Sequence, residues 1–368
     1  MHRRPNLTRD PELAITSLLV LFVVSSCLTG LLHGCSEQTS SPKGDEPLDG
    51  LQYVTPEDVG WSSQKLESAK QFAEQSGYAA VMAAYEGKVF FSWGEVSRNF
   101  YAHSIRKPFL SALYGIHVTS GEIDLNQTLE QLGIDDIPPS LTLVEKQATV
   151  RELLQSRSGV YHEAAAEDSS MIVSRPPRGS HPHGTFYYYN NWDFNTAGTV
   201  FRQTTGLNIF EAFKSEIADL LGMQEFRPAN CTYQFELSKS RHPAYSFRIS
   251  ARDMLRFGVL FQRGGNWLGR QVIQTSWITE STMPHSLIDS ASGLGYGYMW
   301  RIIPVGSSLA QTFGSSGYYH TGVGVHALVI LPDLRLVIVE RVNTDGPTWV
   351  DPGEAGLQLG LMIINARI

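Results

Sequence analysis

The chain has 368 residues, of which 42% are apolar and 18% are charged, and its formal net charge is −7. This length can build one large domain or two moderate ones. The sequence has no basic stripe, which argues against nucleic acid as a partner. Its three cysteines are too few for a disulfide framework.

The first 50 residues resemble an export region rather than part of a fold. A basic segment, residues 2–4, precedes an uncharged stretch, residues 14–32, as in an export signal. Cys27 and Cys35 each end a sequence that fits a lipoprotein cleavage box, and the polar tract that follows favours lipidation of Cys35. An uncleaved anchor is the alternative, because the stretch is about long enough to span a bilayer. We expect residues 1–35 to be a signal, residues 36–54 a flexible tether, and the rest a periplasmic or cell-surface domain held at a membrane.

The mature region begins with a predicted helix, residues 61–75, and a hairpin of two strands, 78–85 and 88–93. An apolar helix follows from Ser104 to about Gly121. Further helices are predicted at 149–154, 192–205 and 209–221 and after Ser250, and then strands at 297–303, 323–331 and 334–342 and a closing helix at 354–365. Strands from both ends must meet in one sheet. We therefore predict an α+β domain over residues 55–365, with a mainly helical region, about 104–245, inserted in it.

Ser104 and Lys107 begin the apolar helix and share one of its faces, because they are three residues apart. A hydroxyl beside an amine in an apolar setting is a nucleophile with its own base, since burial disfavours the ammonium form and lowers the pKa of a lysine. The same spacing recurs from positions 40 and 62, in a polar tract and at an expected helix N-cap. Only Ser104 precedes a run apolar enough to bury its helix.

Other catalytic patterns are poorer. No Gly-x-Ser-x-Gly elbow, no P-loop, and no Gly-x-Gly-x-x-Gly after a predicted strand is present. His181 and His183 could hold zinc, but no carboxylate or third histidine stands at helical spacing from them. We therefore expect neither a cofactor nor a metal.

Four motifs occur in a characteristic order: Ser104-x-x-Lys107, Leu153-Leu154-x-x-x-Ser158-Gly159, Tyr189-x-Asn191 and His320-Thr321-Gly322. In this order the chain resembles the serine β-lactamase and penicillin-binding-protein superfamily over about residues 55–365. It most resembles the class C-related branch, which includes esterases, D-stereospecific peptidases and 6-aminohexanoate-oligomer hydrolases. The resemblance implies a β-lactamase/transpeptidase-like fold, with an antiparallel sheet flanked by the terminal helices.

The resemblance also implies a role for each motif. Ser104 is acylated, Lys107 is its base, and Tyr189 relays the proton to the leaving group. A phenol has an ordinary pKa of about 10, so a neighbouring cation must stabilise its anion, and Lys107 would supply that cation. The register one residue earlier, with Tyr188 as the phenol, satisfies the motif as well, and the spacing to Gly206 favours Tyr189.

Substrate-binding positions follow by the same comparison. Asn191 is expected to hydrogen-bond the amide or carbonyl of the acyl group. The backbone N–H groups of Ser104 and Val323 are expected to form an oxyanion hole, since two converging donors stabilise a tetrahedral intermediate. Gly322 would then allow the substrate to approach the strand edge closely.

His320 departs from the superfamily's usual pattern. β-Lactamases and D,D-peptidases typically carry lysine there, a permanent cation for the substrate carboxylate, and many esterase-like members carry histidine. Histidine has a reference pKa of about 6.5 and is mostly neutral at pH 7. This predicts weak or absent β-lactamase activity and an ester or neutral amide substrate. His326 is the competing candidate if the strand register differs.

Together these features predict an exported serine hydrolase that acts through an acyl-enzyme on Ser104 and takes a small ester, amide or peptide-like substrate. One alternative is a D,D-peptidase or a β-lactamase. The other is a catalytically silent cell-wall-binding protein on the same fold.

Overall fold

The computed structural model describes residues 51–368. The predicted signal, Cys27, the predicted lipidation site at Cys35 and most of the predicted tether therefore lie outside the described residues. Among residues 51–368, no helix is both long and apolar enough to cross a bilayer.

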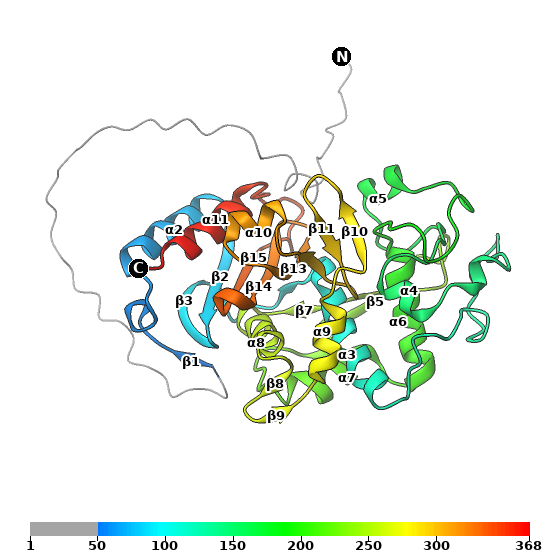
Figure 1. The fold of residues 1–368 in the computed structure, drawn as a ribbon, viewed down its shortest axis with the longest axis horizontal. Helices are drawn as coiled ribbons and strands as arrows, with labels where there is room; N and C mark the ends of the chain where they lie inside the picture. The colour runs from blue at the N-terminus through cyan, green and yellow to red at the C-terminus, as the bar shows by residue number, and fades with distance from the viewer. Residues whose placement is uncertain (1–50) are drawn as a thin grey trace, which may run out of the picture.

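A nine-stranded sheet organises the molecule (Figure 1). Neighbouring strands in this sheet are antiparallel, except for β1 and β3, which form a parallel pair at one edge. In spatial order the strands are β1 (Gln52–Tyr53), β3 (Lys88–Gly94), β2 (Tyr78–Tyr85), β15 (Leu336–Val342), β14 (His326–Leu331), β13 (Gly317–Gly322), β12 (Arg301–Ile303), β11 (Leu294–Tyr296) and β10 (Ser286–Asp289). Because β15 pairs with β2, strands from both ends of the chain meet as the sequence predicts.

Helices cover both faces of this sheet. The outer face carries α2 (Ser63–Gln75), α10 (Ser308–Phe313) and α11 (Ala355–Asn365), and α2 and α11 lie side by side in Figure 1. On the inner face α8 (Ala251–Gln262) packs against β2, β14 and β15. The other helices are α3 (Arg106–Thr119), α4 (Val150–Leu154), α5 (Ser169–Ser174), α6 (Asn191–Thr205), α7 (Ile209–Phe213) and α9 (Thr275–Ser281).

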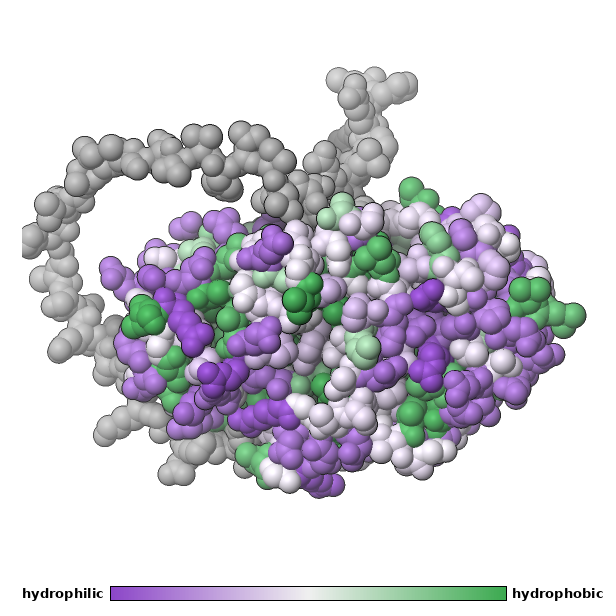
Figure 2. All heavy atoms as spheres, in the orientation of Figure 1, coloured by the Kyte–Doolittle hydropathy of each residue, from purple (hydrophilic) through white to green (hydrophobic). Residues whose placement is uncertain are grey.

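Short strand pairs join the loops outside the main sheet. They are β4 (Phe100–Tyr101) with β7 (Arg248–Ile249), β5 (Thr232–Gln234) with β6 (Ala244–Ser246), and β8 (Asn266–Trp267) with β9 (Arg270–Gln271). On the face seen in Figure 2, apolar residues of the described part form small separate groups among hydrophilic ones. This α+β architecture confirms the predicted fold class.

Local sequence signals explain several helix starts. Ser62 Oγ accepts a hydrogen bond from the backbone N–H of Lys65, so this serine-x-x-lysine copy is an N-cap, as predicted. Thr149 and Glu152 form the predicted capping box of α4. Several predicted bounds were wrong. The strand expected at 297–303 begins only at Arg301. The strand expected at 323–331 begins only at His326, because residues 323–325 turn the chain between β13 and β14. The helix expected at 209–221 ends as an α-helix at Phe213 and continues as a π-helical turn.

Candidate active site

Ser104 lies in a 3₁₀ turn, His103–Ile105, directly before α3 rather than inside it. The preceding residue, His103, has a φ of 48°, an uncommon left-handed conformation for a residue other than glycine. Its Nε2 atom lies 2.8 Å from the Thr344 hydroxyl. The hydrogen bond to Thr344 therefore helps to hold the strained residue beside the candidate nucleophile.

Lys107 is fully buried one turn after Ser104. Its Nζ atom donates to Ser104 Oγ at 2.9 Å and to the Tyr189 hydroxyl at 2.5 Å. The rings of Tyr189 and Phe194 lie 4.4 and 4.7 Å from the same nitrogen, within the range of a cation–π contact. The structure thus brings the serine, lysine and tyrosine together, with the amine between the two hydroxyls.

In the competing register Tyr188 would be the phenol, but its hydroxyl does not contact Lys107. The Tyr188 hydroxyl donates to the backbone carbonyl of Met171 at 2.5 Å. Asn190 caps α6 by accepting from the backbone N–H of Trp192 at 2.9 Å. Tyr188 and Asn190 therefore hold a loop and a helix start, and only Tyr189 reaches Lys107.

Asn191 is the first residue of α6 and is almost fully buried. Its Nδ2 atom donates to the backbone carbonyl of Ala166 at 2.5 Å. Its Oδ1 atom makes no hydrogen bond within the described part of the chain. The amide thus anchors the loop at Ala166, and its carbonyl oxygen is left to accept a hydrogen bond.

The Ser158-Gly159 motif is tied to α6 by Asp193, a residue that the sequence analysis did not single out. The Asp193 carboxyl accepts from the Ser158 hydroxyl at 2.5 Å, from the Ser158 backbone N–H at 3.2 Å and from Asn190 Nδ2 at 3.1 Å. Burial raises the pKa of Asp193 well above its ordinary value, despite the opposing hydrogen bonds. These contacts fix the start of α6, and with it Tyr189, against the neighbouring loop.

His320 lies on β13 and is fully buried, and its ring lies 6.3 Å from the ring of Tyr189. Nδ1 lies 2.8 Å from the carbonyl of Thr321, whereas Nε2 has no hydrogen-bond partner among residues 51–368. Burial lowers the pKa of His320 well below 6.5, and the charges of Lys107 and Arg301 lower it further. The imidazole is therefore neutral at pH 7.

His326, the competing histidine, faces a different group of residues. Its Nδ1 atom accepts from Arg341 Nε at 3.1 Å and from the Val342 backbone N–H at 3.3 Å, and its ring lies 5.4 Å from that of His103. The register of β13 with β14 pairs His320 with Leu328 and Gly322 with His326. It is therefore His320 that lies beside Tyr189.

Gly322 ends β13 against the turn that carries Ser104. A Cβ atom placed on Gly322 would lie 2.8 Å from the carbonyl oxygen of Ala102 and 3.4 Å from the backbone nitrogen of Ser104. Only glycine permits this approach. Val323 follows directly and is 41% exposed. The two backbone N–H groups expected to form an oxyanion hole thus belong to segments in contact.

Arg301 is a candidate site residue that the sequence analysis missed. It lies on β12, next to β13, and its Cζ atom is 5.2 Å from the centre of the Tyr189 ring. Its charge also contributes to the lowered pKa of His320. A guanidinium is a permanent cation, so the site keeps a fixed positive charge although His320 is neutral. The available signal was a basic residue in the strand expected before the His-Thr-Gly motif.

The described residues offer no group of three or more His, Cys, Asp or Glu side chains placed to hold a metal ion. His181 stacks on Phe186 with 4.0 Å between ring centres, and His183 Nδ1 lies 3.0 Å from a carboxylate oxygen of Glu152. These two histidines therefore take part in loop packing.

A sheet with terminal helices on its outer face and helices on its inner face is the architecture of β-lactamases and transpeptidases. The Beta-lactamase family model matches residues 66–361. The chain belongs to the Beta-lactamase family, and this membership supports a serine hydrolase in general. The comparison with curated proteins found no match.

Three solved structures show the same fold. A Bacillus anthracis protein assigned as a 6-aminohexanoate-dimer hydrolase has a TM-score of 0.62 at 17% identity, covering 86% of this chain and 87% of its own. A Bacteroides dorei protein assigned as a β-lactamase has a TM-score of 0.61 at 14% identity, covering 83% and 99%. A penicillin-binding-protein homologue from Caulobacter crescentus has a TM-score of 0.59 at 14% identity, covering 83% and 98%. At these identities the likeness concerns the fold alone.

Proposed function

We propose that the protein hydrolyses an ester or amide bond through an acyl-enzyme on Ser104, with Lys107 and Tyr189 as the proton-transfer pair. The observation that carries this proposal is the placement of Lys107 Nζ, at 2.9 Å from Ser104 Oγ and 2.5 Å from the Tyr189 hydroxyl. These distances lie within the reach required for proton transfer between a nucleophile and its base.

The reaction then has two halves. Ser104 Oγ attacks the carbonyl carbon, and its proton passes to the Lys107–Tyr189 pair. The bond to the leaving alcohol or amine breaks as Tyr189 gives that group a proton. A water molecule next attacks the acyl carbon, loses its proton to the same pair, and releases the acid while Ser104 regains its proton. The backbone N–H groups of Ser104 and Val323 stabilise the negative oxygen in both halves.

The charges near Ser104 and Tyr189 affect which substrate can bind. A neutral His320 attracts a substrate carboxylate less than a lysine would, which supports an ester or a neutral amide. Arg301 beside Tyr189 supports the alternative, a D,D-peptidase or β-lactamase substrate with a carboxylate. The substrate class therefore depends on whether a bound substrate reaches Arg301.

The test compares wild type with Ser104→Ala on p-nitrophenyl esters, D-amino-acid amides and nitrocefin. A fluorophosphonate should label the wild type and leave Ser104→Ala unlabelled. Ser62→Ala is the matched control, because it removes the serine of the N-cap copy of the motif. It should keep full activity and lose only about 1 kcal/mol of stability. Full activity of Ser104→Ala would refute the proposal. A wild type inert to every substrate that still binds peptidoglycan would favour the silent binding protein.

We also propose that the enzyme is exported and anchored to a membrane through a lipid on Cys35. The basic segment, the uncharged stretch and the polar tract after Cys35 support this proposal. Cys35→Ser should release the protein from the membrane fraction, whereas Cys27→Ser should not. A mature N-terminus at Cys27 would refute the assignment to Cys35.

A further inference from the structure

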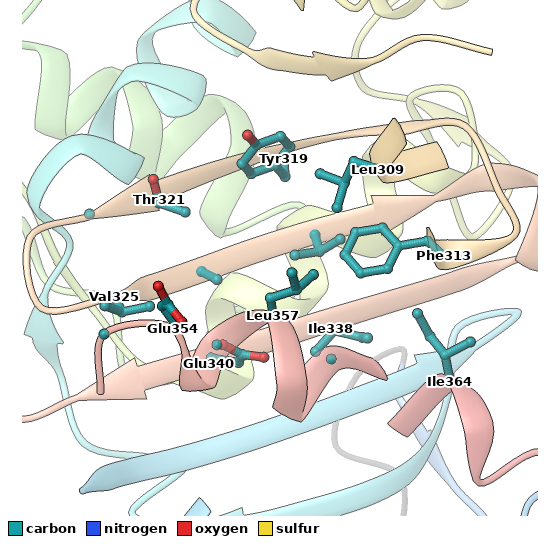
Figure 3. Close-up of a pocket in the computed structure, with 16 residues that line it drawn as sticks. Leu309, Phe313, Tyr319, Thr321, Val325, Ile338, Glu340, Glu354, Leu357 and Ile364 are labelled. Atoms are coloured by element: carbon teal, nitrogen blue, oxygen red, sulfur yellow. The ribbon is translucent and has the colours of Figure 1, made fainter. Parts of the chain in front are cut away.

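A cavity of about 80 Å³ lies on the outer face of the sheet, on the side away from Lys107. Strands β13, β14 and β15 form its floor, and α10 and α11 form its walls (Figure 3). Aliphatic, aromatic and glycine residues make up most of its lining, among them Leu309, Phe313 and Leu357. Ser104, Lys107 and Tyr189 are not among the residues that line it, so it is a separate site.

Glu340 is the unusual member of this lining. It projects from β15 toward α11 and is only 2% exposed. Its Oε2 atom has no hydrogen-bond partner among residues 51–368. The Tyr78 hydroxyl lies close enough to the carboxyl to lower the pKa of Glu340, but it makes no hydrogen bond of good geometry within residues 51–368. A buried carboxyl oxygen without a well-formed hydrogen bond is costly, so this end of the cavity favours a ligand that supplies hydrogen-bond donors.

The charges of the lining residues indicate which kind of ligand the cavity could bind. Glu354 also lines the cavity, and no Lys, Arg or His is among the described residues around it. A water cluster is a poor occupant, since each water needs two to four polar partners and most of this lining is apolar. An ammonium group, by contrast, has three N–H donors for the carboxylate and the phenol oxygen, and a short alkyl chain fits the apolar lining.

We propose that this cavity is a binding site for a small aliphatic primary amine, whose ammonium group pairs with Glu340 and whose alkyl chain lies against α10 and α11. This site is independent of the proposed hydrolase activity. The cavity reaches the end of β13, since Thr321 and Gly322 also line it.

Binding of a cation here is linked to the loss of a proton. Burial raises the pKa of Glu340 to about 8, against a smaller opposing effect of the Tyr78 hydroxyl. Without a bound cation, the Glu340 carboxyl is therefore mostly protonated at pH 7, and it must lose its proton to form the ion pair. The affinity for an amine should rise with pH up to about 8 and then level off until the amine itself deprotonates near pH 10. An uncharged alcohol of the same size should bind with no such dependence.

Glycines on α11 offer a matched pair of variants. A Cβ atom on Gly356 would lie 2.9 Å from Val325 Cγ1, 3.1 Å from the Tyr78 hydroxyl and 3.3 Å from Glu340 Oε2, so Gly356→Ala fills the polar end of the site. On Gly360 the nearest atom is Glu340 Oε1 at 3.9 Å, an ordinary contact. Gly360→Ala makes the same chemical change in the same helix and leaves the polar end open.

The experiment titrates n-butylamine and n-butanol into the purified protein by calorimetry between pH 6 and pH 9. We expect the dissociation constant for n-butylamine to fall about 50-fold from pH 6 to pH 8, as Glu340 ionises. Glu340→Gln, which keeps the shape of the side chain, should abolish that pH dependence. Gly356→Ala should abolish binding, and Gly360→Ala should retain it.

Three results would overturn the proposal: no binding of n-butylamine at any pH, pH-independent binding equal to that of n-butanol, or unchanged binding by Gly356→Ala. Circular dichroism of each variant checks that the fold is kept. The Glu340→Gln comparison decides the matter even if Gly356→Ala fails to fold. Because the readout is binding, a failure of the proposed hydrolase activity would not affect it.

Discussion

Removing a single hydroxyl distinguishes the two adjacent tyrosines. The Tyr189 hydroxyl is 2.5 Å from Lys107 Nζ, whereas the Tyr188 hydroxyl donates to the Met171 carbonyl at the same distance. Tyr189→Phe keeps the ring beside Lys107 and removes only the group that would pass the proton. General acid–base catalysis contributes about 10²- to 10⁴-fold, which corresponds to about 3–5 kcal/mol of transition-state stabilisation. We therefore expect kcat/KM of Tyr189→Phe to fall by about that factor.

Tyr188→Phe is the matched control for this prediction. It removes one buried hydrogen bond, worth about 1 kcal/mol, and should lower the melting temperature by about 2–4 °C. Its kcat/KM should stay within a few-fold of wild type. The assay is steady-state hydrolysis of the best p-nitrophenyl ester, with melting followed by circular dichroism. If Tyr189→Phe stays within threefold of wild type, or if Tyr188→Phe is the inactive variant, the assignment of Tyr189 is wrong.

Three further predictions concern the strand edge, the cation and two histidines with a lowered pKa. Gly322→Ala should lower kcat at least 10²-fold and also lower the melting temperature, because its Cβ would press on the backbone of the turn that carries Ser104; near-normal kcat would contradict this. Arg301→Gln should weaken p-nitrophenyl hydrogen glutarate hydrolysis at least tenfold and that of p-nitrophenyl butyrate under threefold; equal losses would exclude carboxylate recognition. Burial lowers the pKa of His103 and His242 to about 4. The unfolded chain therefore binds more protons between pH 4 and 6.5, and urea unfolding at pH 5 should show about 2 kcal/mol less stability per histidine than at pH 7.5; equal stabilities would refute this linkage.

Local patterns were enough to predict the class of fold. The period of apolar residues and the turn residues predicted the hairpin of β2 and β3, the terminal helices and the meeting of both chain ends in one sheet. These features depend on neighbours in sequence or on the need to bury one face of each element. Strand bounds were less accurate at the turn before His326, because the positive φ of Val325 follows from the turn and not from a local preference of valine.

The geometry of the site needed contacts between distant parts of the chain. Lys107 and Tyr189 are 82 residues apart, and among three consecutive tyrosines no local rule selects the one that faces the lysine. The spacing to Gly206 favoured Tyr189 over Tyr188, and the structure shows how the two differ, since the Tyr188 hydroxyl donates to the Met171 carbonyl. The left-handed backbone of His103 had no sequence signal, because the Thr344 hydroxyl that helps to hold it is 241 residues away.

Arg301 changes the interpretation of the histidine at position 320, because it supplies a positive charge nearby. The ring of Tyr189 lies 4.4 Å from Lys107 Nζ and 5.2 Å from Arg301 Cζ, and both charges act on the fully buried His320. A lysine at position 320 would add a third positive charge to a buried cluster of cations, and like charges in a poorly solvated site are costly. A neutral imidazole avoids that repulsion. A neutral imidazole at position 320 is therefore compatible with the arginine on the neighbouring strand.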